Sequence, residues 1–109
     1  MVLVRAVIRR EKLGDVIRAL VSAGFTGATV INNAGGIGGE GGVMEVKGRS
    51  YEILIPRVVV EVATTADKAK MVVEIISASA KTGHVGDGRI FILPLLDSVR
   101  VRTGESGVI

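Results

Sequence analysis

Hydrophobic and polar residues follow two different periods along the first part of the chain. Residues 2–8 are mostly apolar and rich in β-branched side chains, which predicts a strand. From Lys12 onward the spacing becomes helical and defines one apolar face. That face consists of Leu13, Val16, Ile17, Leu20 and Val21. Gly24 is expected to end the helix as a C-terminal glycine.

A second strand and helix pattern follows in the middle of the chain. Residues 26–31 and 58–62 predict strands. Pro56 indicates that the chain just before residue 58 is irregular or lies at a sheet edge. Residues 64–67 offer N-cap candidates for a second helix. Its buried side is expected to consist of Val72, Val73, Ile75, Ile76 and Ala80.

The end of the chain predicts two further extended segments. Residues 90–93 predict a strand that ends at Pro94. Residues 98–103 alternate apolar and basic side chains, which predicts a short C-terminal strand. In such a strand Arg100 and Arg102 would share one face.

The order strand, helix, strand, strand, helix, strand indicates an α+β fold. This order consists of two strand–helix–strand halves. With both helices on one face of the sheet, the two halves give a ferredoxin-like βαββαβ sandwich, formed by residues 1–109 as a single domain. The other sheet face is expected to be apolar too, because residues 58–62 show little polar alternation. An exposed apolar face is a liability, so we expect it to be buried in a closed ring of subunits.

Glycine dominates the segment between the second and third predicted strands. Six glycines fall within residues 35–42, and Ile37 is the only large apolar residue among them. Ordering such a segment costs backbone entropy and buries little in return. We therefore expect a long mobile loop that reaches to about Tyr51, and long loops of this kind are usually functional or disordered.

Composition excludes several classes of function. The 109 residues carry a net charge of +3, contain no cysteine and include only 3% aromatic residues. Disulfide frameworks and thiolate metal sites are excluded, and single-stranded nucleic-acid binding by aromatic stacking is disfavoured. No signal-peptide pattern and no apolar stretch of membrane-spanning length is present. We expect a soluble cytoplasmic protein that does not span a membrane.

Residues 82–92 are the strongest candidate for a ligand-binding segment. Three glycines, Asp87 and Arg89 lead directly into the last strand. Such a segment could cradle a phosphate group between backbone N–H groups and a fixed positive charge, or it could be a plain turn. Asp87 is expected to fix the turn through backbone contacts rather than to bind a metal. His84 is the only histidine, which disfavours a histidine metal site.

Two segments carry a resemblance to a known family. Residues 82–91, TGHVGDGRIF, resemble the TG-x-[IV]-GDGKIF signature of the PII nitrogen-regulatory signal-transduction proteins. Residues 100–105, RVRTGE, resemble the family's RIRTGE segment. The glycine-rich segment lies where the family has its long T-loop, here about residues 36–52. The resemblance covers nearly the whole chain, and the two motifs together are specific.

The resemblance implies a homotrimer that binds ATP or ADP in the clefts between subunits. Gly86, Gly88 and Arg89 would contact the phosphates from one subunit. Arg100 and Arg102 would reach them from the neighbouring subunit, because a triphosphate needs several convergent donors. The remaining positions that match the family's nucleotide site are Thr29, Gly36, Gly38 and Ala63.

The implied function is that of a non-enzymatic sensor. Its T-loop would change with the bound nucleotide and regulate a partner protein, such as an ammonium transporter or an enzyme of nitrogen assimilation. Three alternatives stay open: a sensor of AMP, cyclic AMP or an anion outside nitrogen control, a slow nucleotidase, and a trimeric scaffold without nucleotide. Against an enzyme, the sequence offers no obvious nucleophile–base pair.

Two positions, Glu40 and Arg57, depart from the family pattern, whereas Tyr51 aligns near a tyrosine that some members have modified by nucleotidylation. Glu40 replaces the glutamine that helps hold Mg²⁺ and 2-oxoglutarate; its carboxylate could still ligate Mg²⁺ but would repel the dicarboxylate. Arg57 replaces the lysine that pairs with this effector and changes the shape of the charge. Binding of 2-oxoglutarate is therefore doubtful. Nucleotidylation of Tyr51 is disfavoured, because the surrounding loop differs and looks shorter.

Overall fold

The computed structural model describes residues 1–37, 43–107 and 109, and it contains two sheets and two α-helices. The main elements are β1 (Val2–Arg9), α1 (Leu13–Ser22), β2 (Ala28–Gly36), β5 (Ile55–Thr64), α2 (Ala66–Ala80) and β6 (Gly88–Pro94). A 3-10 turn spans Arg10–Lys12, and a separate hairpin consists of β3 (Val43–Val46) and β4 (Arg49–Glu52).

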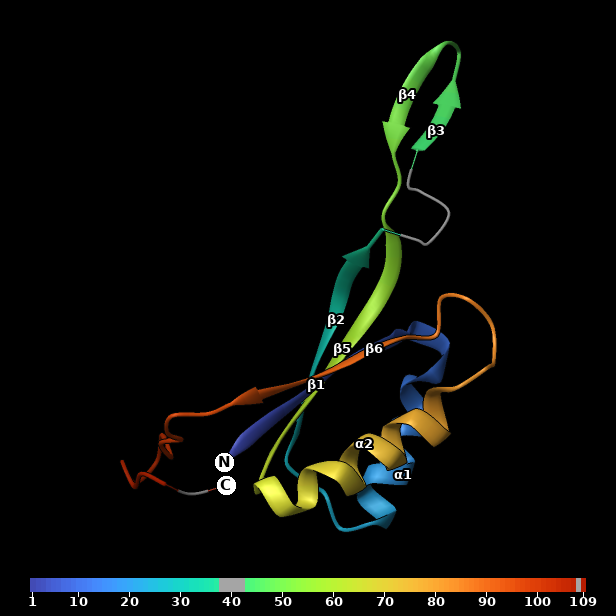
Figure 1. The fold of residues 1–109 in the computed structure, drawn as a ribbon. Helices are drawn as coiled ribbons and strands as arrows, with labels where there is room; N and C mark the ends of the chain where they lie inside the picture. The colour runs from blue at the N-terminus through green and yellow to red at the C-terminus, as the bar shows by residue number, and fades with distance from the viewer. Residues whose placement is uncertain (38–42, 108) are drawn as a thin grey trace.

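The main sheet has the strand order β2-β5-β1-β6, and all three pairings are antiparallel. Both helices lie on the same face of this sheet, as Figure 1 shows. This arrangement confirms the predicted ferredoxin-like α+β fold. β1 and β5 occupy the centre of the sheet, where each pairs with a strand on both sides.

The core lies between the helices and the covered sheet face. Every second residue of the two central strands points to it, because side chains alternate across a strand. Its most buried members are Val4, Ala6, Ile8, Val58, Val60, Val62, Val16, Leu20, Val72 and Ile76. The expected helix faces are confirmed, except that Val21 is half-exposed at the end of α1.

The predicted helix ends are confirmed by backbone geometry. Gly24 has φ 92°, a conformation that favours glycine, and the N–H of Phe25 donates to the carbonyl of Leu20 at 2.9 Å. Thr65 is the N-cap residue of α2, although its side chain makes no capping hydrogen bond. Neither helix of the described residues has the length and hydrophobicity that crossing a lipid bilayer requires.

The sheet face opposite the helices is mixed in character rather than uniformly apolar. One row across the four strands is Thr29, Glu61, Arg5 and Phe91, and the next is Ile31, Val59, Val7 and Arg89. The Nε atom of Arg5 donates to Glu61 at 2.6 Å in the middle of the first row. The expectation of an apolar face was therefore only partly right, because the alternation places a charged pair among valines.

Much of the segment expected as a loop forms strands in the described residues. β2 continues to Gly36, because its backbone pairs with β5 as far as Ile55. β3 and β4 then pair from Val43–Glu52 to Val46–Arg49. Lys47 and Gly48 between them have φ 52° and 76°, the signs that a tight hairpin turn requires. Figure 1 shows this hairpin projecting beyond the main sheet.

Pro56 lies where its missing N–H is tolerated. It pairs with Gly35 of β2 on one side, whereas β1 has already ended with the Arg9–Arg57 pair on the other. A proline can occupy a strand position that has no donor to lose. The expectation of an edge position is thus confirmed for this part of β5.

The C-terminal segment is a turn rather than the expected strand. Among the residues described there, an isolated bridge joins Val99 and Ser106, and Gly104 has φ 70°. The N–H of Arg100 donates to the Glu105 carbonyl at 2.8 Å, and the N–H of Gly104 donates back to the Arg100 carbonyl at 2.8 Å. The prediction of a strand from the alternation of apolar and basic residues was wrong, because no strand of the described residues pairs with residues 98–103.

Candidate functional site

The glycine turn before β6 is organised around the carboxylate of Asp87. One oxygen of this carboxylate accepts hydrogen bonds from the N–H groups of Thr82 and Gly83, each at 2.9 Å, and the other accepts from the Thr82 hydroxyl. These bonds, above all the one from the Thr82 hydroxyl, hold the pKa of Asp87 well below its ordinary value. The turn therefore keeps a negative charge at its base, as the predicted backbone role of Asp87 requires.

Arg9 ties this turn to the centre of the sheet. Its Nε atom donates to Asp87 at 3.2 Å, and its Nη2 atom donates to the carbonyl of Val85 at 2.8 Å. The Arg9 side chain is 22% exposed, so it is largely covered by its neighbours. The two ends of this contact are 78 residues apart in sequence, and no local pattern indicated it.

Gly86 lies where two guanidinium groups converge. Its φ is 101°, and a Cβ atom there would lie 3.1 Å from Nη2 of Arg9 and 3.4 Å from Nη2 of Arg57. Arg57 also lies against Gly36, since a Cβ on that glycine would be 3.5 Å from Cγ of Arg57. The structure thus brings together Gly36, Arg57 and Gly86, three residues that were predicted for the site from separate segments.

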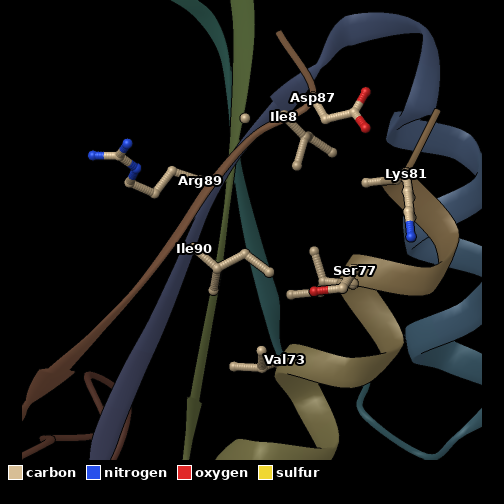
Figure 2. A pocket seen from close by; sticks show the side chains of 10 residues that line it. Ile8, Val73, Ser77, Lys81, Asp87, Arg89 and Ile90 are labelled. Carbon is tan, nitrogen blue, oxygen red and sulfur yellow. The ribbon is translucent and has the colours of Figure 1, made fainter. Parts of the chain in front are cut away.

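Gly88 and Arg89 place the start of β6 against β1. A Cβ on Gly88, which has φ 109°, would lie only 1.9 Å from the carbonyl oxygen of Val7, so this close approach requires glycine. Arg89 pairs with Val7 and points away from the helices, as Figure 2 shows. Arg89 therefore belongs to the uncovered sheet face.

A hollow of about 310 Å³ lies on the opposite, helix-covered side of β6. Figure 2 shows Ile8, Ile90 and Val73 forming its apolar wall, with Lys81 and Asp87 at its rim. The side chain of Arg89 points away from the helices, toward the uncovered face of the sheet. Two residues of the predicted phosphate site, Gly88 and Arg89, are among the residues that line the hollow, so the two features adjoin at the start of β6.

Ala63 lies toward the other end of the sheet, and Thr29 lies in a row near the middle of β1. Thr29 pairs with Glu61, and Ala63 pairs with Leu3 near the start of β1. Ala63 is six residues along β5 from Arg57, a separation of roughly 20 Å at the rise of an extended strand. Both residues face the uncovered side, but neither approaches the Gly86 turn in the same protomer.

Arg100 and Arg102 also lie beyond that far end. β6 finishes where Pro94 pairs with Val2, whereas Gly88 pairs with Ile8 at the opposite end of the same strand. The N–H of Leu95 donates to the carbonyl of Met1, which keeps the departing chain at the far end. Arg100 forms a 3.5 Å ion pair with Glu105 there.

Three predictions from the sequence fall outside what the structure describes. Gly38 and Glu40 lie in the undescribed residues 38–42, and the side chain of Tyr51 lies outside the description as well. Among the described residues no group of three His, Cys, Asp or Glu side chains is arranged to hold a metal ion.

Comparison with known proteins identifies relatives along the whole chain. The family model described as nitrogen regulatory protein P-II matches residues 1–105. Nitrogen regulatory protein P-II 1 of Methanothermobacter thermautotrophicus is 43% identical over 106 residues, which cover 95% of this chain and 91% of that protein. Nitrogen regulatory protein P-II of Rhizobium etli is 39% identical and is covered to 96%, with 97% of this chain aligned.

A solved structure gives the same result for the fold. The crystal structure of Arabidopsis thaliana PII bound to citrate superposes with a TM-score of 0.79 and 32% sequence identity. The match covers 97% of this chain and 84% of the Arabidopsis chain.

Proposed function

Because this chain belongs to the nitrogen regulatory protein P-II family, we propose that it binds ATP or ADP between the subunits of a cytoplasmic homotrimer. It would act without catalysing a reaction and would regulate a partner protein through residues 36–52, the T-loop of a single domain 1–109. An enzyme of nitrogen assimilation or an ammonium transporter fits the names of the relatives, which are called nitrogen regulatory proteins.

One observation carries the proposal: the matching residues divide between opposite ends of the sheet. Gly36, Gly86 and Gly88 lie at one end, and Ala63, Arg100 and Arg102 lie at the other, while Arg89 and Thr29 lie in adjacent rows between them. A single protomer cannot close both sets around one small ligand across roughly 20 Å. Two protomers that pack through the uncovered sheet face could do so, with each end completing the other.

The chemistry at the first end suits a polyphosphate. The glycine turn supplies backbone N–H groups, and Arg57 and Arg89 add permanent positive charge on the same sheet face. Arg100 and Arg102 of the neighbour would add two further guanidinium groups, which can bind phosphate oxygens in bidentate fashion. Mg²⁺ would accompany ATP and reach Glu40, whose carboxylate is a suitable ligand.

Arg57 also links the nucleotide end to the proposed T-loop. It lies against Gly36, the last residue of β2 and the start of that loop. ATP and ADP differ by one phosphate and would place different charge beside this residue. A ligand shifts a conformational equilibrium only through such a difference in contacts, so the loop can report which nucleotide is bound.

A carboxylate anion is the second candidate ligand. The convergence of Arg9 and Arg57 on Gly86 would suit a carboxylate as well as a phosphate, and the Arabidopsis relative was solved with citrate. AMP and cyclic AMP are further candidate ligands, and the titration described below includes them. ATP turnover faster than about 0.1 s⁻¹, slow by enzyme standards, would instead favour a nucleotidase.

Calorimetric titration with ATP, ADP, AMP, cyclic AMP and citrate, with and without Mg²⁺ and 2-oxoglutarate, tests the proposal. We expect at least one adenine nucleotide to bind with a micromolar Kd, about −8 kcal/mol. Arg100→Ala combined with Arg102→Ala should abolish most of this binding. The control, Arg18→Ala combined with Lys70→Ala, removes the same charge from exposed helix positions and should bind normally. Unchanged affinity in the first variant would refute the assignment.

A further inference from the structure

Arg9 holds a place in this site that the sequence did not reveal. It is the last residue of β1, a central strand that pairs with β5 on one side and β6 on the other. From there its guanidinium group crosses to the glycine turn and makes two different contacts, with the Val85 carbonyl at 2.8 Å and with Asp87 at 3.2 Å. A rigid strand is therefore bonded to the turn on both sides of Gly86.

The turn is shaped around this guanidinium group. A side chain on Gly86 would approach Arg9 to 3.1 Å, so the glycine leaves the room that Arg9 occupies. The positive φ of Gly86 places Val85 and Asp87 where one guanidinium group can reach both. Lysine could not reproduce this contact, because a single ammonium group lacks the planar fork of arginine.

Arg9 also controls the charge that an anion would meet. Asp87 lies next to Gly86 and Gly88, so its carboxylate would repel a phosphate group bound to the amides of the turn. The contact with Arg9 offsets that negative charge. None of the ion pairs among the described residues includes Arg57, so its positive charge adds to the attraction for an anion.

We propose that Arg9 is a positioning residue for the polyphosphate: it fixes the glycine turn to β1 and masks the Asp87 carboxylate, leaving the turn amides and Arg57 to bind the anion. This inference rests on the proposed nucleotide function and adds a residue to it. It predicts that loss of Arg9 lowers the binding affinity most for the ligands that carry the most negative charge.

Arg9→Gln, Arg9→Lys and the control Arg10→Gln test the assignment. Arg10 is the neighbouring, exposed cation and forms no ion pair among the described residues, so Arg10→Gln removes the same charge without touching the turn. In calorimetry, Arg9→Gln should weaken ATP binding about tenfold or more, as expected for losing hydrogen bonds to a charged group. AMP should lose less, roughly twofold to threefold, because it carries fewer charged oxygens.

Arg9→Lys keeps the charge but not the two-sided contact, so it should remain at least about threefold weaker than the original protein. Full affinity in Arg9→Lys, or equal affinities for Arg9→Gln and Arg10→Gln, would overturn the assignment. Equal losses for ATP and AMP would contradict the charge argument in the same way.

Hydrogen exchange on the protein without nucleotide separates this inference from the proposed function. The N–H groups of Thr82 and Gly83 should exchange faster in Arg9→Gln than in Arg10→Gln, because the acceptor Asp87 loses its anchor. Unchanged exchange would refute the role of Arg9 in fixing the turn, whether or not ATP binds. Failure of the original protein to bind any nucleotide would instead refute the proposed function, and with it the polyphosphate role.

Discussion

Arg9 and Arg57 lie directly opposite each other across the β1–β5 pairing, and both guanidinium groups reach Gly86. Like charges opposite each other on a sheet destabilise it. Asp87 forms an ion pair with Arg9, so a bound anion could neutralise the charge of Arg57. The relationship explains why the site should bind anions while costing the ligand-free protein some stability.

Substituting Arg57 therefore should separate stability from binding. Arg57→Gln is expected to leave the free energy of unfolding within about 0.5 kcal/mol of the original value, or to raise it slightly, because one like-charge contact disappears. The same variant should weaken ATP binding about tenfold. Thermal unfolding and calorimetry measure the two effects.

Arg5→Gln provides the matched comparison for that experiment. Arg5 lies on the same sheet face but pairs with Glu61 at 2.6 Å, so its loss should lower stability by up to about 1 kcal/mol. A marked loss of stability in Arg57→Gln, larger than that in Arg5→Gln, would show that the two arginines do not repel each other.

Two glycines of the same turn should respond very differently to alanine. Gly88→Ala would place a Cβ 1.9 Å from the Val7 carbonyl oxygen, between paired strands that cannot separate without breaking the ladder. We expect a loss of about 3 kcal/mol or more. Gly83→Ala has nothing within 4 Å and should cost only about 1–2 kcal/mol for its positive φ. Urea unfolding measures the free energy of unfolding of both variants. Equal losses of stability would contradict the close packing of Gly88 against Val7.

Asp87 predicts a particular dependence of stability on pH. Its pKa in the folded protein is below the ordinary value of 3.8, so the unfolded chain binds a proton more readily than the folded one. Its contribution is present in full above about pH 5 and is lost as the pH falls below 3.8 toward the folded pKa. Asp87→Asn should therefore be less stable at pH 7, with a difference that shrinks below pH 4.

Urea unfolding of both proteins between pH 2.5 and pH 7 measures this difference. Thr82→Ala serves as a second test, because the Thr82 hydroxyl is the largest cause of the lowered pKa. In Thr82→Ala the folded pKa should lie closer to 3.8, so the loss of stability should begin at the same pH, end at a higher pH and be smaller in total. A difference between the original protein and Asp87→Asn that stays constant down to pH 2.5 would argue against a perturbed Asp87.

The proposed trimer can be tested on the uncovered sheet face. Val59 lies between Val7 and Ile31 in one row, where a carboxylate would be buried if a neighbouring subunit packs there. Val59→Glu should dissociate the trimer and remove nucleotide binding, because burying an unpaired charge is costly. Val21→Glu, at a half-exposed position of α1, should leave the trimer intact. Sedimentation equilibrium distinguishes the outcomes, and a trimeric Val59→Glu would place the interface elsewhere.

The hairpin shows where reasoning from composition failed. The density of glycine suggested a mobile loop, yet β2 extends through Gly35 and Gly36, because β5 supplies partners for their backbone groups. Lys47-Gly48 between two short segments was the one local signal for β3 and β4. The same reliance on local pattern predicted a strand at Arg100 and Arg102, which pair with no strand in the part of the chain that the structure describes.

The sequence alone determined the order of the six main elements, the end of α1 at Gly24 and the character of the glycine turn, because hydrophobic period and glycine conformation are local properties. Only the tertiary structure decided that Arg9 meets that turn, that Glu61 and Arg5 pair among valines, and that the matching site residues divide between two ends of the sheet. Those facts depend on strand register and on contacts between residues far apart in the sequence, 78 positions in the case of Arg9 and Asp87, which no local pattern of side chains encodes.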